Sequence, residues 1–294
     1  MRFNGVRAAK ALILCAMPPL LTLPLHIALI AARDAGRGRV DASVDLGRSV
    51  QSIEIGPDQW RVGGASYPYL ERCRERTIYH WDGASFEPVA RFGTSLLKLV
   101  PTDWGPPTFE IDGIKMLPTA QVSPFDDAAR KVALVEPRGK VVLDTCAGLG
   151  YFAHWCLDGG AQRVVSYEKN PDVLWLRALN PWSPDPQDAR LDLRSGDVAE
   201  RIRDHGDASA DAILHDPPRF GIAGELYSQA FYDQLARVLR PSGRLFHYTG
   251  TPNKLTSGRD VPREVSRRLQ TAGFVTEVVG DGVLARRSGR KGRS

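Results

Sequence analysis

The run KVVLDTCAGLG at residues 140–150 constrains the fold of this chain more than any other stretch. Its apolar segment VVL is short and rich in β-branched side chains, as in a buried parallel strand, and Asp144 and two glycines end it. Gly148 and Gly150 lack a Cβ atom, so the backbone there can approach a bound molecule closely. Residues 151–157 then predict a helix whose first free N–H groups point back into the turn. A strand, a glycine turn and a helix in this order indicate a site for a nucleotide-like ligand.

The acidic residues around this turn bear on the class of ligand. Gly148, Gly150 and Ala153 satisfy the G-x-G-x-x-[G/A] pattern, with Glu168 at the end of the next predicted strand. A tight turn that binds nothing would satisfy the pattern too. Asp144, ahead of the glycines, suits a cationic amino acid moiety better than a pyrophosphate, because a fixed carboxylate repels phosphates. The pattern therefore favours S-adenosylmethionine over a dinucleotide, and a dehydrogenase stays an alternative.

Two later motifs carry a family resemblance. An acidic turn, SGD at 195–197, and a strand ending in HDPP at 215–218 follow the glycine turn, and together the three resemble the class I S-adenosylmethionine-dependent methyltransferases. The phrases LDTCAGLGY, YEKNP, LNPWS, HDPPRFGIAGELYS, RVLRPSGRLFHYTG and GRDVPR narrow the resemblance to a family of predicted, largely archaeal methyltransferases of unassigned substrate, over residues 86–287. The resemblance implies the fold and S-adenosylmethionine as cofactor, and it hardly constrains the methyl acceptor.

Strand-like and helix-like segments alternate after residue 140 with short connections, which indicates a doubly wound parallel sheet. Two strand-like runs close the chain at 273–279 and 283–287, joined by Gly-Asp-Gly. They match the antiparallel last strand of the methyltransferase sheet. We therefore expect an α/β fold with a doubly wound, Rossmann-like class I methyltransferase sheet and an antiparallel last strand, preceded by a small β-rich domain. The expected helices cover residues 123–135, 151–158, 171–179, 198–204, 225–239 and 261–271, and the strands cover 140–144, 163–167, 190–195, 210–215 and 243–248.

The region ahead of the catalytic domain consists of short alternating runs between turn residues. Asp-Gly pairs at 82–83 and 112–113 stand between strand-like runs and predict hairpins. The aromatic residues of this region could line a substrate site, but packing is the favoured interpretation. The expected parts of the chain are an apolar extension or membrane anchor with linker (1–40), a β-rich domain (41–118), a methyltransferase domain (119–287) and a basic disordered tail (288–294).

An apolar run at residues 11–32 is about long enough to span a membrane. A cleaved signal peptide conflicts with the cofactor, which such a destination would lack. A membrane anchor with the catalytic domain on the cytoplasmic side, and an extension with no part in the catalytic fold, both stay open. We expect a cytoplasmic location in either case, with membrane contact only through this run.

The charge is unevenly distributed. The chain carries a net charge of +5, yet residues 1–40 and residues 286–294 each carry +5, which leaves the body at −5. The basic ends could hold RNA, whereas the acidic body favours a small amine. The four cysteines form no C-x-x-C pair, so we expect neither a metal site nor disulfides, and Cys146 in the glycine turn is interpreted as a packing residue.

The family resemblance implies roles for the residues at the strand ends. Glu168 would accept hydrogen bonds from the ribose hydroxyls, because one carboxylate can take two donors. Asp197 would bind the adenine amine, and Val198 would offer its backbone N–H to the ring. The remaining cofactor-binding residues would be Gly148 and Gly150 beneath the ribose and methionine carbons, and Asp144 at the ligand ammonium.

The turn at Asp216 and Pro217 resembles the amine-holding turn of methyltransferases that act on exocyclic amines. Two acceptors on one NH₂ group would direct its lone pair at the methyl group. His215 is a candidate proton acceptor, although a histidine that ends a buried strand is more often structural. Those enzymes usually have an aromatic residue directly after the prolines, whereas here Arg219 intervenes before Phe220. The expected substrate-binding residues are Arg219, Phe220 and Tyr248.

The sequence thus predicts an S-adenosylmethionine-dependent methyltransferase that acts on an amine nitrogen of an RNA base or a small molecule. An aminopropyl transferase that uses decarboxylated S-adenosylmethionine is the related alternative. A noncatalytic S-adenosylmethionine-binding protein or membrane-tethered scaffold is the alternative from another class.

Overall fold

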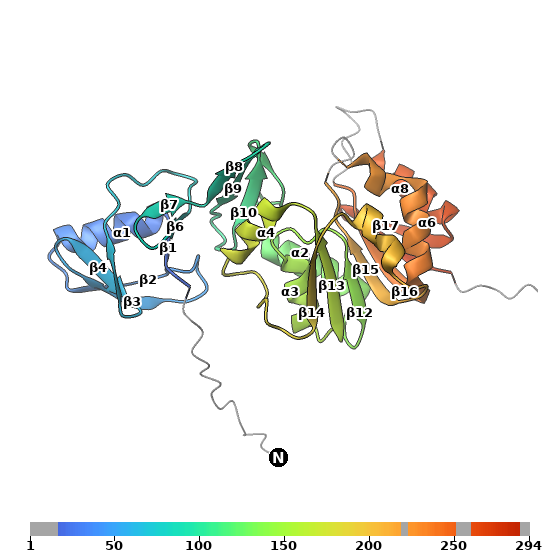
Figure 1. Cartoon of the computed structure of the whole chain (residues 1–294), viewed down its shortest axis with the longest axis horizontal. Helices are drawn as coiled ribbons and strands as arrows, with labels where there is room; N and C mark the ends of the chain where they lie inside the picture. The colour runs from blue at the N-terminus through green and yellow to red at the C-terminus, as the bar shows by residue number, and fades with distance from the viewer. Residues whose placement is uncertain (1–16, 219–222, 251–259, 289–294) are drawn as a thin grey trace, which may run out of the picture. The chain divides into compact units, whose positions relative to one another are not determined.

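A computed structural model describes residues 17–218, 223–250 and 260–288 of the chain. The chain divides into two compact units, residues 1–89 and residues 90–294. Each unit has its own sheets and its own buried residues (Figure 1).

The first unit packs one helix and two antiparallel sheets around aromatic side chains. Trp60 is fully buried, and its ring lies 4.9 Å from Tyr67 and 6.0 Å from Phe86 between centroids. These three rings belong to the core of the unit, so their role is packing, whereas Trp104, in the second unit, is 49 % exposed. The elements are β1 Leu20–Leu21, α1 Leu23–Asp34, β2 Arg39–Ala42, β3 Gln51–Ile55, β4 Gln59–Val62, β5 Ala65–Pro68, β6 Tyr79–Trp81 and β7 Phe86–Pro88, and the sheets have the orders β2-β3-β4-β5 and β1-β6-β7.

The predicted extension and linker over residues 1–40 require a correction. From residue 17 onward this region belongs to the first unit, because α1 buries Leu25, Leu29 and Ala32 in the core and β2 pairs with β3. None of the helices in the described part of the chain is both long and apolar enough to span a membrane, so the anchor prediction is not supported there. Residues 11–16 of the apolar run lie outside the described residues.

The predicted domain boundary at 118/119 also differs from the structure, which divides at 89/90. The four-stranded sheet β11-β10-β9-β8 (β8 Ala90–Phe92, β9 Leu96–Val100, β10 Thr108–Ile111, β11 Ile114–Lys115) belongs to the second unit. The loop between β9 and β10 is held in the second unit by Tyr151, whose hydroxyl donates to the carbonyl of Pro107 at 2.7 Å. The Asp112-Gly113 turn has both residues at positive φ, and it joins β10 to β11 as the predicted hairpin.

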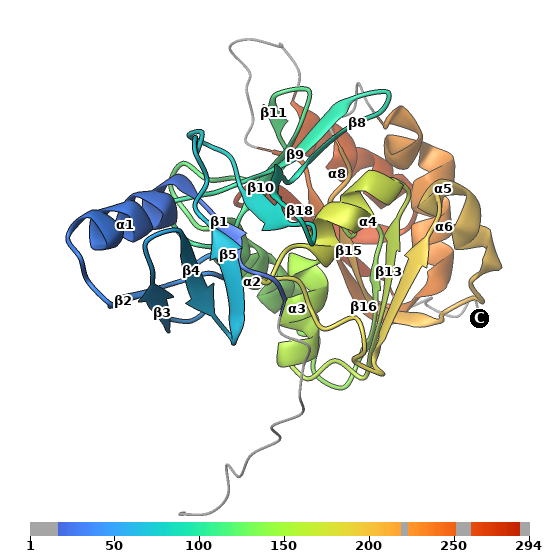
Figure 2. The same cartoon turned by 60° about the vertical axis from the view of Figure 1, so that its left-hand side comes forward.

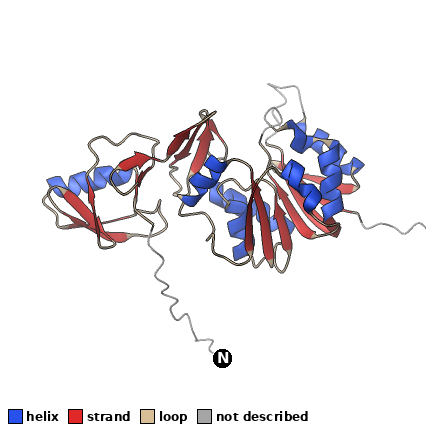
Figure 3. Cartoon of the chain, in the orientation of Figure 1, coloured by secondary structure: helices blue, strands red, loops and turns tan. Residues whose placement is uncertain are grey.

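A seven-stranded sheet with the order β14-β13-β12-β15-β16-β18-β17 forms the centre of the second unit (Figure 1; Figure 3). The first five strands are parallel, and β18 is antiparallel to both β16 and β17, which confirms the predicted fold class. The strands are β12 Val141–Asp144, β13 Arg163–Glu168, β14 Leu191–Ser195, β15 Ala210–His215, β16 Leu239–Tyr248, β17 Phe274–Val279 and β18 Gly282–Arg287.

Helices cover both faces of this sheet. Helices α2, α3 and α4 lie on one face, and α6 and α8 lie on the other (Figure 2). The middle of the sheet is therefore inaccessible, as for Val142, Ile213 and Leu245. The helices are α2 Pro124–Val135, α3 Tyr151–Asp158, α4 Pro171–Ala178, α5 Val198–Arg201, η1 Ile202–Asp204, η2 Gly224–Tyr227, α6 Gln229–Val238 and α8 Val261–Thr271.

The helix predicted over 225–239 is interrupted. A short 3₁₀ turn, η2, ends at Tyr227, and α6 starts afresh after Ser228, whose side chain accepts the N–H of Phe231 at 3.1 Å. Serine is a preferred N-cap because its oxygen satisfies a helix N–H that has no other partner. The break leaves η2 beside the carboxyl end of β15, where the candidate site lies.

Candidate functional site at the carboxyl edge of the sheet

Four carboxylate residues meet at the carboxyl edge of the parallel strands. Asp144 ends β12, Glu168 ends β13, Asp197 begins α5 directly after β14, and Asp216 follows β15. These strands are neighbours in the order β14-β13-β12-β15, so the four residues follow one another along one edge. In open α/β sheets this edge is where ligands bind.

The glycine turn between β12 and α3 requires residues without a side chain. Gly148 and Gly150 have φ values of +49° and +84°, in the left-handed region that disfavours other residues. A Cβ atom on Gly150 would lie 2.5 Å from Cζ of Arg177, whereas one on Gly148 would meet only Phe109 Cε1 at 3.8 Å. The turn thus exposes backbone on one side and packs against a guanidinium on the other.

Glu168 is tied to the glycine turn. One of its carboxylate oxygens accepts the N–H of Gly148 at 3.0 Å, and the other accepts the N–H of Asn170 at 2.9 Å. Burial raises the pKa of this carboxyl, and the two backbone donors counteract the rise. A carboxylate has about four acceptor positions, so two stay available for hydroxyl donors of a ligand.

Asp144 lies beneath the turn and is inaccessible to solvent. Its Oδ2 accepts the hydroxyl of Ser166 at 2.6 Å, while its Oδ1 has no hydrogen-bond partner among the described residues. Burial raises the pKa of Asp144 to about 6, although Ser166 and Arg177 act in the opposite direction. Asp144 can therefore contact a ligand only through a water or after a movement of the turn. Its predicted interaction with the ligand ammonium would then be indirect.

Arg177 is a site residue that the sequence did not reveal. Its side chain is 4 % exposed, and neither Nη1 nor Nη2 has a hydrogen-bond partner within the described parts of the chain. Burial lowers its pKa, and the carboxylates of Asp144 and Glu168 oppose this. An arginine in the last turn of a predicted helix normally faces solvent, so the sequence contained no signal for the burial of Arg177.

Asp197 and Val198 lie at the far end of the edge. Asp197 caps α5 by accepting the N–H of Ala199 at 2.8 Å, and its second oxygen lies 3.5 Å from Nζ of Lys169. Val198 is buried in the core. Their position after β14 agrees with a place at the adenine end of a ligand whose ribose lies at Glu168.

Asp216 is half-buried at the other end of the edge, and burial raises its pKa to about 6 against the opposing effect of Lys131. The turn after it is held by Tyr227, whose hydroxyl donates to the carbonyl of Pro218 at 3.1 Å. Pro217 is buried. Two predicted substrate-binding residues, Arg219 and Phe220, lie outside the described residues.

The contacts of His215 favour the structural role over that of a proton acceptor. The residue is fully buried, and its Nε2 lies 3.1 Å from the carbonyl oxygen of Leu226, which can only accept, so Nε2 carries the proton. Its Nδ1 then accepts the hydroxyl of Thr145 at 2.7 Å. Burial lowers the pKa of His215 well below its ordinary value. Both ring nitrogens are used within the protein, so the residue is structural.

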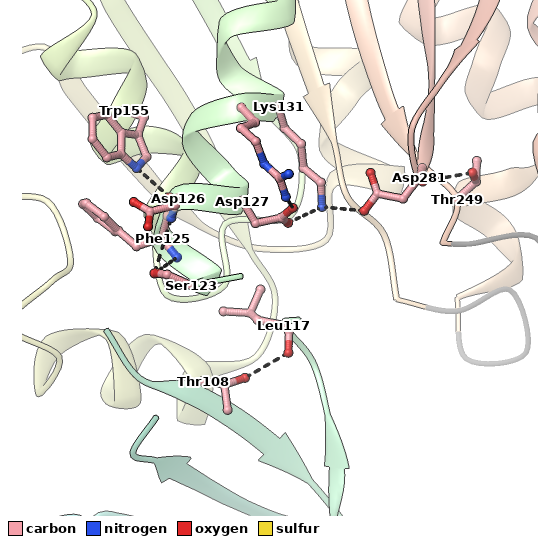
Figure 4. Close-up of polar contacts among 11 residues, drawn as sticks. Thr108, Leu117, Ser123, Phe125, Asp126, Asp127, Lys131, Trp155, Thr249 and Asp281 are labelled. Atoms are coloured by element: carbon pink, nitrogen blue, oxygen red, sulfur yellow. Dashed lines mark hydrogen bonds and ion pairs between the residues drawn. The ribbon is translucent and has the colours of Figure 1, made fainter. Parts of the chain in front are cut away.

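A buried lysine, Lys131 of α2, is the second site residue that the sequence did not reveal (Figure 4). Its Nζ lies 2.6 Å from Asp127 and 3.3 Å from Asp281, and 4.1 Å from the ring centroid of Tyr248. The spacing of Asp127 and Lys131 predicts a helical ion pair, but such pairs usually face solvent. Nothing in the sequence indicates that this one is buried beside the acceptor turn.

The described cysteines are free, and burial raises the pKa of the Cys146 thiol well above its ordinary value. Within residues 17–218, 223–250 and 260–288, no group of three His, Cys, Asp or Glu side chains is arranged to hold a metal ion. The buried charged groups described here at the edge are carboxylates together with Lys131 and Arg177.

Comparisons with known proteins bear on the family of the chain. Residues 173–277 match a family described as S-adenosyl-L-methionine-dependent methyltransferases. An uncharacterized protein of Methanocaldococcus jannaschii is 44 % identical over 216 residues, which are 72 % of this chain and 74 % of that protein. Polyamine aminopropyltransferase 2 of Streptomyces coelicolor is 29 % identical over 190 residues, 62 % of this chain and 34 % of that protein.

Among solved structures, a spermidine synthase from Thermotoga maritima superposes with a TM-score of 0.53 at 17 % identity, covering 72 % of this chain and 78 % of that one. At that identity the likeness concerns the fold alone. It extends over more of the chain than the residues that match the family.

Proposed function

We propose, from the premise that the chain belongs to the class I S-adenosylmethionine-dependent methyltransferase superfamily, that it transfers the methyl group of S-adenosylmethionine to an amine nitrogen held at Asp216. The observation that carries the proposal is the row of carboxylates along one sheet edge, with Glu168 bonded to the glycine turn at one point and Asp216 beside an acceptor turn at another.

The residues of the edge fit the cofactor. Glu168 has acceptor positions left for the ribose hydroxyls, and Asp197 is placed to take the adenine amine. Gly148 leaves backbone of the turn open for a ligand, while Gly150 packs on the guanidinium of Arg177. The unpartnered Oδ1 of Asp144 would order the ligand ammonium through a water. When bound, the cofactor supplies an electrophilic methyl group on a sulfonium.

The protein's part in the transfer is to hold a neutral amine in line with that methyl group. Asp216 would accept one N–H of the amine and so direct the lone pair at the carbon. As the C–N bond formed, the electron pair of the broken C–S bond would stay on sulfur, and the Asp216 carboxylate would accept the proton that the nitrogen then loses. Asp216 must be ionised for this role, and with a pKa of about 6 it is mostly ionised at a pH above that value.

The acceptor that we favour is a small amine rather than an RNA base. The body of the chain between its basic ends carries a net charge of −5, which would repel a polyanion. RNA bound through the basic ends is the competing outcome of the test.

Aminopropyl transfer is the second candidate, and the similarity to a polyamine aminopropyltransferase is the observation that favours it. The two reactions share the attacking amine and differ in the donor, since decarboxylated S-adenosylmethionine lacks the α-carboxylate. Asp216 would orient the amine in either reaction.

A labelled-methyl assay tests the proposal. The full chain is incubated with S-adenosylmethionine that carries a labelled methyl group and with fractionated small molecules or RNA from cells, with Asp216→Asn as the control. Label in an amine that depends on Asp216 supports the proposal. Label that accumulates equally with the variant, or no transfer to any fraction by a chain that binds the donor, contradicts it and favours a noncatalytic binding protein.

A further inference from the structure

A buried cation, Lys131, lies at the end of the carboxyl edge where Asp216 is found, and it has no role in the methyl transfer proposed above. We propose that Lys131 is the positioning residue of this site, and that its ammonium, held by Asp127 and Asp281 against the ring of Tyr248, keeps the neighbouring Asp216 ionised and ready to bind the amine. The inference rests on the proposed function of Asp216 as the amine acceptor.

The first half of the arrangement comes from α2. Ser123 caps this helix by accepting the N–H of Phe125 at 3.2 Å, which fixes its first turn. Asp127 and Lys131 follow one turn apart, and their side chains are 8 % and 6 % exposed. A lysine is rarely buried to this extent without a specific partner, because removing an ammonium from water is costly.

The second half comes from the antiparallel strands β18 and β17, which follow β16 at the end of the sheet. Asp281 lies in the turn between β17 and β18, and its backbone carbonyl accepts the N–H of Thr249 at 3.0 Å. Its carboxylate lies 3.3 Å from Nζ of Lys131, and Figure 4 shows the ammonium between this carboxylate and that of Asp127. Lys131 therefore joins α2 to the end of β16 and the β17–β18 turn.

The strand register brings Asp216 to the same place. His215 pairs with His247 in the parallel ladder of β15 and β16, so Asp216, the residue after β15, follows at the level of Tyr248, the last residue of β16. The Lys131 ammonium lies 4.1 Å from the centroid of the Tyr248 ring, so it lies over the residue that is level with Asp216 in the strand register, and its charge interacts with that of Asp216. A cation over a tyrosine ring is itself stabilised by the π electrons.

The charges of this cluster decide what Lys131 does for Asp216. Burial raises the pKa of Asp216, nearby carboxylates raise it further, and Lys131 is the cation that lowers it. For Lys131, burial lowers the pKa, but the carboxylates outweigh this and the pKa is raised, so the lysine stays charged. The titratable groups around Asp216 are Lys131 and Asp127 on α2, Asp144 after β12, Cys146 in the glycine turn, Tyr227 in η2, Tyr248 on β16 and Asp281 in the β17–β18 turn.

The chain offers a matched control for Lys131. Arg130, the preceding residue of α2, pairs with the same Asp127 at 2.8 Å, but its side chain is 66 % exposed. Removing Arg130 takes one positive charge from the same helix and the same partner, Asp127, and leaves every buried member of the cluster in place. A general loss of helix stability would affect both variants, whereas the proposed role concerns Lys131 only.

The test is a pH titration of Asp216 followed by ¹³C NMR of the aspartate Cγ atoms in the full chain, with the resonance assigned by its loss in Asp216→Asn. For Lys131→Met we expect the midpoint of Asp216 to rise by about one pH unit or more, the usual effect of losing a neighbouring opposite charge. Arg130→Met should leave the midpoint within roughly a third of a unit, because an exposed charge contributes little. Lys131→Arg should restore the wild-type midpoint.

An unchanged midpoint in Lys131→Met, or an equal rise in Arg130→Met, would overturn the proposal. Should Lys131→Met fail to fold, Asp281→Asn keeps the question testable: it removes one carboxylate near Asp216 and leaves the lysine shared between fewer partners, so the midpoint must fall. A rise, or no shift, would contradict the proposed charge balance. The titration uses neither donor nor acceptor, so its result is independent of whether methyl transfer itself is found.

Discussion

Substitution of the two glycines of the turn is expected to have unequal effects, and the structure gives the size of the difference. Gly148→Ala places a methyl group 3.8 Å from Phe109, an ordinary contact, so the cost is that of a left-handed residue, about 1 kcal/mol. Gly150→Ala carries the same backbone cost and also places Cβ 2.5 Å from Cζ of Arg177. The buried guanidinium must move, and we expect a total loss of about 2–4 kcal/mol in the free energy of unfolding.

A double-mutant cycle measured by urea denaturation isolates that contact. Gly150→Ala should cost less in an Arg177→Ala background than in the wild type, with a coupling energy of about 1 kcal/mol or more, as expected for residues in direct contact. Gly148→Ala, combined with the same Arg177→Ala change, should show additive effects. If Gly150 and Arg177 were additive as well, or if both glycine variants lost the same stability, the packing of the turn on the guanidinium would be refuted.

Three further outcomes follow from the hydrogen bonds and charges of the edge. Glu168→Gln should weaken S-adenosylmethionine binding by about ten- to a hundredfold in calorimetry, because the amide cannot replace a charged acceptor, and unchanged affinity would remove the residue from the ribose site. Asp216→Asn should leave the affinity for S-adenosylmethionine within about threefold and abolish turnover. In the wild type, turnover should fall as the pH decreases through about 6, because Asp216 then takes up a proton. A rate that stays constant down to pH 5 would contradict this role of Asp216. Tyr232→Phe removes the hydroxyl that lies 2.9 Å from Nε2 of His247 and leaves a buried acceptor unpaired, so urea denaturation should report a loss of about 1–3 kcal/mol, and a neutral result would show that the bond does not matter.

The sheet of the second unit could be predicted from the sequence because local and global signals agree there. Runs of β-branched residues, glycines at turns and caps such as Ser123 and Asn170 all place the element ends within a few residues of those in the structure. The carboxylates at strand ends were found for the same reason, since the carboxyl ends of parallel strands share an edge. The alternation of strand-like and helix-like segments shows where each strand ends, and therefore which residues lie at that edge.

What failed depends on contacts between segments that are distant in sequence. The apolar run before residue 33 has the composition of an anchor, but from residue 23 it is a short helix that buries Leu25 and Leu29 in its own unit. Lys131 and Arg177 are charged residues on amphipathic helices, and only the packing of those helices against the edge shows that they are buried. His215, by contrast, was a candidate from the sequence, but both of its ring nitrogens form hydrogen bonds inside the protein and are not available to a substrate.

The central claim is tested most directly by calorimetric titration of the full chain with S-adenosylmethionine, decarboxylated S-adenosylmethionine and NADH, side by side and with Glu168→Gln as the control. The account predicts that S-adenosylmethionine binds most tightly, that NADH does not bind, and that Glu168→Gln lowers the affinity for the sulfonium ligands. Preference for the decarboxylated form would replace methyl transfer by aminopropyl transfer. No binding of either sulfonium ligand would contradict the assignment of the carboxyl edge as a donor site.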